Sequence, residues 1–183
     1  WKVNVDGTKN ILAACLEHHV KRFIYVSTDS VYGDGDNPGA TEKTQPNPVY
    51  FAEGNYPASK LMAEKLVLES YRGHALPVVI IRPCLMYGPG KSPGTKILKR
   101  WQAKRMHLVV DWGRAKMSLV YVVDVARALI LAGTHPRAVG KCYNISDGVP
   151  YSRREILQTL ETITGRRKLF LTVPSTSLHR LFC

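Results

Sequence analysis

The stretch YPASKLMAEKLVLESYRGHALPVVIIR, residues 56–82, contains two successive hydrophobic patterns. From Tyr56 to Tyr71 the apolar residues recur at helical spacing, which predicts an amphipathic helix. From Pro77 to Arg82 the apolar residues are continuous and mostly β-branched, as in a strand that is buried on both faces. A helix that leads directly into such a strand is typical of a parallel α/β sheet.

The same step occurs upstream, and strands continue to alternate with helices downstream. Gly7 to Val20 is predicted to be a helix, and Arg22 to Ser27 a buried strand. Ser152 and Glu155 have the S-x-x-E spacing of a capping box, which predicts a helix start there. The remaining predicted elements are a helix near residues 96–104, a strand near 108–111, an apolar run at 119–123, a helix at 124–132 and a strand at 141–146. The alternation predicts an α/β fold with a doubly wound, mostly parallel sheet, and ligands are expected beyond the carboxyl ends of its strands.

The composition of the 183 residues narrows the class of protein. Apolar residues make up 45% and charged residues 22%, which is typical of a globular domain rather than a disordered chain. The net charge of +12 favours anionic partners, but aromatic residues are not interleaved with the basic ones, so nucleic-acid binding is disfavoured. The most apolar segment, Ser118 to Ala132, is interrupted by Asp124 and Arg127, and no membrane span is predicted.

The cysteines and histidines do not predict a metal site. The four cysteines are widely spaced with no C-x-x-C pair, so we expect a reducing compartment and a cytoplasmic protein. His18 and His19 are adjacent at the end of a predicted helix, where they complement the helix dipole. Asp124 directly precedes an apolar helical run and is interpreted as the N-cap of that helix.

Tyr56 and Lys60 form the sharpest candidate catalytic pair. They are four residues apart on the predicted helix and therefore share one of its faces. A phenol is a poor base at neutral pH, but an ammonium ~4 Å away contributes roughly 4 kcal/mol at an effective dielectric constant of 20. That interaction lowers the pKa of the phenol by up to about 3. The spacing therefore predicts a tyrosine that acts as a general acid or base.

Polar residues also follow the predicted strands. Ser27-Thr28-Asp29-Ser30 comes at the end of one strand, and Arg82-Pro83 ends the next.

The motifs that carry a family resemblance are NVDGT at 4–8, VSTDSVYG at 26–33, YPASK at 56–60, RPCLMYGPG at 82–90 and VYVVDVARA at 120–128. Together they resemble the extended short-chain dehydrogenase/reductase superfamily, which includes the NAD-dependent epimerases and dehydratases. Within it, YPASKLMAEKLVL, residues 116–123 and CYNISDG look most like the 3β-hydroxysteroid dehydrogenase and dihydroflavonol reductase branch.

The resemblance implies a Rossmann-type sheet and a role for each matching residue. Tyr56 is the expected general acid/base, and Lys60 is expected to lower its pKa and to hold the nicotinamide ribose. Thr28 is expected to hydrogen-bond the substrate oxygen, with Ser27 as the neighbouring alternative and as a cofactor contact. By the same analogy, Pro83 and the backbone around Met86 would lie against the nicotinamide. The implied cofactor is NAD or NADP.

The chain is interpreted as a fragment of a longer protein, with separate segments for cofactor and substrate binding. The superfamily's glycine-rich G-x-x-G-x-x-G turn is not found, and we expect it in a segment before Trp1. Residues 1–183 are predicted to form part of one NAD(P)-binding Rossmann-type domain, and residues 91–118 and 147–183 to bind the small-molecule substrate. Superfamily members often dimerise through two helices, represented here by Gly7 to Val20 and Tyr56 to Tyr71, so a homodimer is expected by analogy.

Two departures from the superfamily's patterns bear on the reaction. Sugar-nucleotide dehydratases carry a Glu after the Asp of VSTD, whereas this sequence has Ser30. The hypothesis of a dehydratase is therefore disfavoured. Many nucleotide-sugar epimerases carry an Arg-Asp pair that grips the diphosphate, and Met117-Ser118 stands in its place here. Arg114 and Lys116 are close enough along the chain to substitute for that pair.

Three functions stay open on the sequence. The first is an NAD(P)-dependent oxidoreductase that transfers a hydride to or from a steroid- or flavonoid-like alcohol or ketone. The second is a nucleotide-sugar epimerase, and the third is a non-catalytic subunit that kept the enzyme's fold. A large apolar pocket roofed by residues 91–112 would favour the first function. Convergence of Arg105, Arg114 and Lys116 on one anion-sized site would favour the second.

Overall fold

A computed structural model describes residues 1–33, 39–46, 56–89, 106–110, 113–114, 116–167 and 169–173. The chain folds into two compact units. The first unit comprises Trp1–Cys84 and Val122–Ser146, and the second comprises Leu85–Tyr121 and Asp147–Cys183. The predicted assignment of residues 91–118 and 147–183 to substrate binding stays a prediction.

The first unit is built on a parallel sheet of three strands in the order β1-β2-β6. These are β1 (Phe23–Val26), β2 (Val78–Pro83) and β6 (Cys142–Ile145). Every residue of the central strand β2 is buried, as the continuous apolar run predicts. Val26 lies opposite Ile81 in the parallel register, so β1 and β2 end at the same edge of the sheet. The predicted parallel α/β sheet is confirmed.

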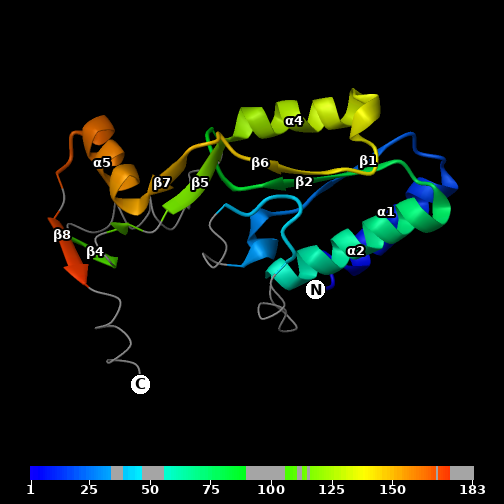
Figure 1. Cartoon of the computed structure of the whole chain (residues 1–183), viewed down its shortest axis with the longest axis horizontal. Helices are drawn as coiled ribbons and strands as arrows, with labels where there is room; N and C mark the ends of the chain where they lie inside the picture. The colour runs from blue at the N-terminus through cyan, green and yellow to red at the C-terminus, as the bar shows by residue number, and fades with distance from the viewer. Residues whose placement is uncertain are drawn as a thin grey trace, which may run out of the picture. The chain divides into compact units, whose positions relative to one another are not determined.

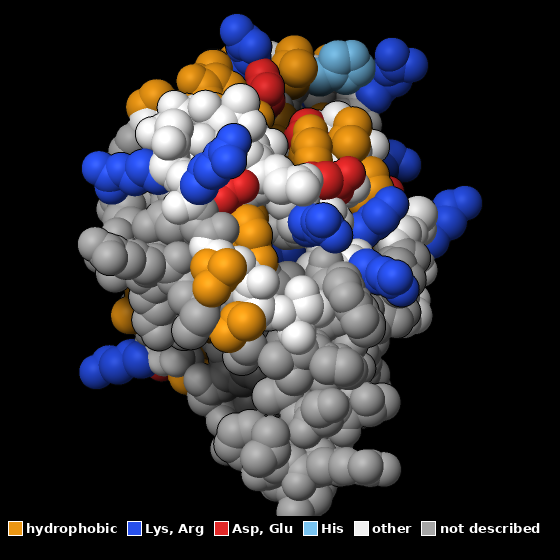
Figure 2. Space-filling view, turned by 90° about the vertical axis from the view of Figure 1, so that its left-hand side faces the viewer, with side chains coloured by type: hydrophobic (Ala, Val, Ile, Leu, Met, Phe, Trp, Pro, Cys, Tyr) orange, Lys and Arg blue, Asp and Glu red, His pale blue; other side chains and the backbone are white. Residues whose placement is uncertain are grey.

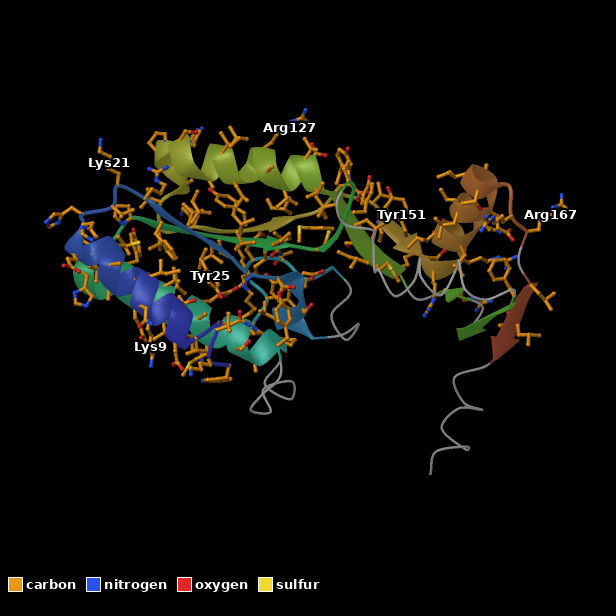
Figure 3. The ribbon with its side chains drawn as sticks, turned by 180° about the vertical axis from the view of Figure 1, so that it is seen from behind. Lys9, Lys21, Tyr25, Arg127, Tyr151 and Arg167 are labelled. Carbon is orange, nitrogen blue, oxygen red and sulfur yellow. The ribbon has the colours of Figure 1, made fainter. Side chains whose placement is uncertain are left out.

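Helices cover both faces of this sheet (Figure 1). They are α1 (Asp6–Glu17) and α2 (Tyr56–His74) on one face, and α4 (Val122–Thr134), followed by the short η4 (Pro136–Ala138), on the other. Leu12 of α1 and Val67 of α2 share one apolar cluster with Tyr25 of β1, and Figure 3 shows Tyr25 between the sheet and this helix layer. Ala132 of α4 packs with Val79 in a second cluster. Two separate apolar layers therefore enclose the sheet, as a doubly wound fold requires.

Asp124 does not cap α4, contrary to the sequence-based interpretation. The helix begins at Val122, directly after the strand that ends at Tyr121, so Asp124 lies inside its first turn. The Asp124 carboxylate instead accepts a hydrogen bond of 2.9 Å from the guanidinium of Arg127, and both side chains are exposed. Figure 3 shows Arg127 on the outer side of the helix. A carboxylate in the first turn still complements the helix dipole.

The second unit contains shorter strands. Its three-stranded sheet has the order β3-β5-β7, with β3 (Leu85–Tyr87) parallel to β5 (Lys116–Tyr121) and β7 (Pro150–Ser152) antiparallel to it. A separate parallel pair is formed by β4 (Met106–Val110) and β8 (Leu169–Val173). Ser152 caps α5 (Arg153–Thr164) through the predicted capping box with Glu155. The helix predicted near residues 96–104 lies outside the described residues.

Two observations concern the surface. Where side chains are described on the face shown in Figure 2, Lys and Arg residues are scattered among acidic and apolar ones rather than gathered in one patch. Such mixing of charge signs is typical of a solvated surface.

Among the residues that the structure describes, no helix combines the length and the apolar character needed to cross a bilayer.

Candidate active site

The candidate site begins where β1 ends. The backbone N–H of Ser27 donates a hydrogen bond of 2.7 Å to the carbonyl oxygen of Ile81, which continues the pairing of β1 with β2 by one residue. The chain then turns into η1 (Asp29–Tyr32), with Thr28 as its N-cap. The Thr28 hydroxyl oxygen accepts a hydrogen bond of 3.2 Å from the N–H of Ser30. Thr28 and Ser27 are therefore held at the carboxyl edge of the sheet, as predicted for a ligand site.

Lys60 connects α2 to the same edge. Its ammonium group donates a hydrogen bond of 2.8 Å to the carbonyl oxygen of Val26, the last residue of β1. The Lys60 nitrogen also lies 4.9 Å from the centre of the Tyr25 ring, within cation–π range. Burial lowers the pKa of Lys60, while the charge of Glu64 acts to raise it. The ring and the carbonyl oxygen together select one position for the ammonium group.

Tyr56 differs from the sequence-based expectation in its ionisation. The pKa of the Tyr56 phenol is raised rather than lowered, first by burial and second by the negative charge of Asp29. The expected lowering by Lys60 is not seen in this structure, in which the Lys60 ammonium group donates to the carbonyl oxygen of Val26. The side chain is 54% exposed, so it is open to a ligand. The influence of Asp29 also indicates that the phenol lies near the Thr28 turn.

The first turn of α2 is anchored by a residue of the segment before α1. The side-chain amide of Asn4 donates a hydrogen bond of 2.9 Å to the hydroxyl oxygen of Ser59. The Ser59 hydroxyl in turn donates to the carbonyl oxygen of Tyr56 at 2.8 Å. Sequence reasoning assigned no role to Asn4 or Ser59, although both lie in motifs that carried the resemblance. These contacts fix the helix turn that carries the tyrosine.

The residues around Ser27 fit the nicotinamide cofactor that the resemblance implies. Ser27 is 4% exposed, and its hydroxyl oxygen has no hydrogen-bond partner among the described residues. A buried hydroxyl without a partner is costly, so a polar ligand group at this position would stabilise the site. Lys60 has three N–H donors, of which the Val26 carbonyl oxygen accepts one. Ser27 and Lys60 can therefore donate to the hydroxyl groups of a ribose.

The two residues predicted to pack against the nicotinamide belong to different units. Pro83 is buried at the end of β2, and the next N–H, that of Cys84, donates to the carbonyl oxygen of Ile145 at 3.1 Å. Met86 lies on β3 in the second unit. The first unit contains Ser27, Thr28, Tyr56, Lys60 and Pro83. The role of Met86 stays a prediction.

A buried ion pair beside the site was missed by sequence reasoning. The Arg82 guanidinium donates two hydrogen bonds to the Glu64 carboxylate, with Nε to Oε1 at 2.9 Å, and a third of 2.6 Å to the Tyr32 hydroxyl. Burial alone would lower the pKa of Arg82, but the hydrogen bonds and charge of Glu64 outweigh it and raise that pKa. The available signal was a Glu on the apolar face of one helix and an Arg at the end of an apolar strand. A buried charge needs a partner of opposite charge, so the two residues could have been predicted to pair.

A cation-lined cavity lies in the second unit. It has a volume of about 340 Å³ and is lined by Gly113, Arg114, Lys116, Ser152, Arg154 and Glu155. Lys116 and Ser152 are direct partners in the antiparallel pairing of β5 with β7, so their side chains share one face. The pKa of Glu155 is lowered chiefly by its hydrogen bonds with Ser152, and also by the charge of Lys116. We call this set of six residues the basic cavity.

Comparison with known proteins agrees with the fold and the motifs. Residues 1–146 match the family model described as the NAD dependent epimerase/dehydratase family. The chain is 32% identical over 174 residues to a UDP-glucose 4-epimerase of Vibrio cholerae, covering 94% of this chain and 52% of that protein. It is 28% identical over 185 residues to a 3-beta-hydroxysteroid dehydrogenase of Mycolicibacterium neoaurum, covering 98% and 50% respectively.

A solved structure supports the same conclusion. The UDP-glucuronic acid 4-epimerase of Bacillus cereus, crystallised with NAD, superposes with a TM-score of 0.80 at 26% identity. The match covers 93% of this chain and 56% of the solved one. The chain therefore spans about half the length of the proteins that it matches. Both epimerases and a dehydrogenase are among these relatives, so the similarity by itself does not select the substrate.

Proposed function

Because the chain belongs to the NAD-dependent epimerase/dehydratase family, we propose that the protein is an NAD(P)-dependent oxidoreductase that interconverts a secondary alcohol and a ketone. One observation carries the proposal: the Lys60 ammonium group is hydrogen-bonded to the last residue of β1, two residues before Thr28, and Tyr56 begins the same helix as Lys60. These are the side chains that proton transfer to or from a substrate oxygen needs.

The residues have separate tasks in this proposal. Tyr56 donates a proton to the ketone oxygen during reduction and takes it back during alcohol oxidation. Its raised pKa means that the phenol is protonated at neutral pH, which suits proton donation. Thr28 donates a hydrogen bond to the same substrate oxygen. Its present acceptors, Asp29 Oδ1 at 3.3 Å and Ser30 Oγ at 3.2 Å, are distant enough to be exchanged for substrate.

Lys60 and Ser27 would hold the cofactor. Their N–H and O–H groups lie at the sheet edge, where the nicotinamide ribose would be bound. When bound, NAD(P) supplies the hydride donor or acceptor for the reaction.

The substrate proposed first is an apolar, steroid- or flavonoid-like alcohol or ketone. Met117 stands where many nucleotide-sugar epimerases carry the arginine of their diphosphate clamp. A thioether offers no hydrogen-bond donor to a phosphate and packs well against an apolar ligand. The similarity to a 3-beta-hydroxysteroid dehydrogenase supports the same class.

Replacement of Lys60 by alanine tests the cofactor site. In the full-length protein, Lys60→Ala is expected to weaken NADH and NADPH binding by roughly 10-fold or more, because a charge-assisted hydrogen bond is lost. Binding is measured by titration of the nucleotide's fluorescence. Lys65→Ala is the matched control, since Lys65 is an exposed lysine on the same helix. Its variant is expected to bind as the wild type does.

This titration, followed by a turnover assay, separates the three open functions. Equal weakening in both lysine variants would contradict the assignment of Lys60. If the wild-type protein binds neither nucleotide, both enzymatic functions fail, and the non-catalytic subunit is favoured. If it binds one of them, turnover is assayed with a 3β-hydroxysteroid and with UDP-glucose.

A nucleotide-sugar epimerase is the second candidate, and the basic cavity favours it. Arg114 and Lys116, two of the three residues in the sequence-based criterion, line one cavity, and Arg154 adds a third positive charge. Arg105 lies outside the described residues. Successive side chains of a strand point to opposite faces, so Lys116 lies on the face of β5 opposite Met117. The cavity therefore does not coincide with the family's clamp position, which is why this candidate ranks second.

Replacement of Lys116 by alanine tests the second candidate. If the basic cavity binds the diphosphate of a nucleotide sugar, Lys116→Ala should weaken UDP-glucose binding by roughly 10-fold, since one charged hydrogen bond is lost. Isothermal titration calorimetry of the full-length protein with UDP-glucose measures this effect. Lys9→Ala is the control, because Figure 3 shows Lys9 on the outer side of α1. Equal affinities in both variants and the wild type would remove the support that the cavity lends to an epimerase.

A further inference from the structure

Two side chains of opposite charge are buried against each other in the first unit. Glu64 is 1% exposed and Arg82 is 7% exposed, and they form a two-pronged ion pair. A buried ion pair contributes little to stability compared with apolar residues of the same volume, because both charges lose their hydration. Its presence in an otherwise apolar helix–sheet interface therefore calls for a further role.

Arg82 also connects the ion pair to η1 and, through it, to β6. Its Nη1 group donates to the Tyr32 hydroxyl oxygen at 2.6 Å, and its guanidinium carbon lies 5.0 Å from the centre of the Tyr32 ring. The Tyr32 hydroxyl donates in turn to Asn144 Oδ1 of β6 at 2.9 Å. The backbone N–H of Asn144 donates to the Glu42 carboxylate at 2.8 Å. We call the side chains of Glu64, Arg82, Tyr32 and Asn144 the polar bridge.

Two members of the polar bridge, Glu64 and Tyr32, belong to the two elements that carry the proposed catalytic residues. Glu64 follows Lys60 by four residues on α2, so the two side chains lie on the same helix face. Tyr32 is the last residue of η1, the short helix that Thr28 caps. Arg82 lies between them on β2. The bridge is thus a direct polar connection between the element that carries Thr28 and the element that carries Tyr56 and Lys60.

We infer that Arg82 and Tyr32 are positioning residues, which hold the Thr28 turn at the correct distance from the Tyr56–Lys60 helix. This inference rests on the proposed function, because it concerns the alignment of the residues assigned there. Arginine suits the task better than lysine, since its planar group can bind Glu64 and Tyr32 at once in fixed directions. Small displacements of catalytic groups cost rate without preventing ligand binding.

Tyr32→Phe in the full-length protein tests the inference. The variant keeps the aromatic ring over Arg82 and removes only the hydroxyl that links Arg82 to Asn144. We expect kcat to fall by about 10- to 100-fold while NADH affinity stays unchanged. A readout that needs no substrate is amide hydrogen exchange. We expect faster exchange at Ser30, whose N–H is bonded to the Thr28 hydroxyl.

Arg22→Met provides the matched control. Arg22 likewise ties distant segments together, through hydrogen bonds to the carbonyl oxygens of Ala132 at 3.1 Å and His135 at 2.8 Å. It lies just before β1 begins, at the opposite end of that strand from Thr28. We expect this variant to lose stability without any change in kcat or in the exchange rate at Ser30.

Two results would overturn the inference. One is a Tyr32→Phe variant with wild-type kcat and wild-type exchange at Ser30; the other is a Tyr32→Phe variant that differs from wild type only as Arg22→Met does. Tyr56→Phe separates this failure from that of the proposed function. A Tyr56→Phe variant with full activity contradicts the proposed function, whereas an inactive one beside an unaffected Tyr32→Phe contradicts only the positioning role. If no probe substrate is turned over, the exchange rate at Ser30 decides the inference alone.

Discussion

Replacing Glu64 by alanine is expected to lower the free energy of unfolding by about 3–5 kcal/mol, because it leaves the Arg82 guanidinium buried without its counter-charge. The contacts of the ion pair support a change of this size. Glu64 accepts two of the hydrogen bonds that Arg82 donates, and both side chains are almost fully buried. Urea denaturation of the full-length protein, followed by circular dichroism, measures the change.

Two further variants make the result specific to the ion pair. Glu69→Ala removes an exposed carboxylate from the same helix and is expected to change stability by less than about 0.5 kcal/mol. The double variant Glu64→Leu with Arg82→Met replaces both charges by apolar groups and is expected to recover most of the lost stability. If the polar bridge positions the catalytic residues, this double variant regains stability but not kcat. A small effect of Glu64→Ala would mean that Arg82 reaches water or another partner when its carboxylate is lost.

Replacing Tyr56 by phenylalanine is expected to lower kcat by roughly 10²–10⁴-fold, the usual contribution of general acid–base catalysis. NADH affinity should stay within about twofold, since the residues proposed to hold the cofactor, Ser27 and Lys60, are untouched. Steady-state kinetics with the 3β-hydroxysteroid or UDP-glucose probe measures the loss. Tyr143→Phe is the matched control, because Tyr143 is an exposed tyrosine on β6 with no assigned role.

The pH dependence gives a second check on the same residue. The pKa of Tyr56 is raised, so the phenolate is the minor form at neutral pH. If the phenolate is the base in alcohol oxidation, the rate should rise about tenfold per pH unit until the pH approaches that pKa. The rate of ketone reduction, which uses the protonated phenol, should stay level over the same range. Opposite pH profiles for the two directions would contradict the role of Tyr56.

Most of the first unit could be predicted from local patterns. The predicted helix from Tyr56 to Tyr71 is α2, which continues for one more turn to His74, and the predicted strand from Pro77 to Arg82 is β2 shifted by one residue. These predictions worked because an apolar face or an apolar run is a property of neighbouring residues. The helix start at Ser152 was equally local, since a capping box involves only four consecutive positions.

The start of α4 and the ionisation of Tyr56 could not be predicted in this way. Asp124 has the residue type and the place of an N-cap, but the strand that ends at Tyr121 leads into the helix without a loop. Helical spacing correctly put Tyr56 and Lys60 on one face, yet the Lys60 ammonium group binds the carbonyl oxygen of Val26. The pairing of Tyr121 with Tyr87 extends β5 up to the start of α4, and burial and the charge of Asp29 raise the pKa of Tyr56. Both outcomes depend on residues distant in sequence.

Local sequence patterns were enough to predict the alternation of helices and strands, the edge of the sheet at which Thr28 lies, and the presence of Tyr56 and Lys60 in one helix. The pairing of the buried charges, in contrast, follows from how the chain folds. Glu64 and Arg82 are 18 residues apart in sequence, and Tyr32 is 50 residues from Arg82, yet all three are hydrogen-bonded. Helical and strand periodicity arise from backbone geometry within a few residues. The partners of a buried charge are instead selected by the packing of the sheet against its helices, which brings these distant residues into contact.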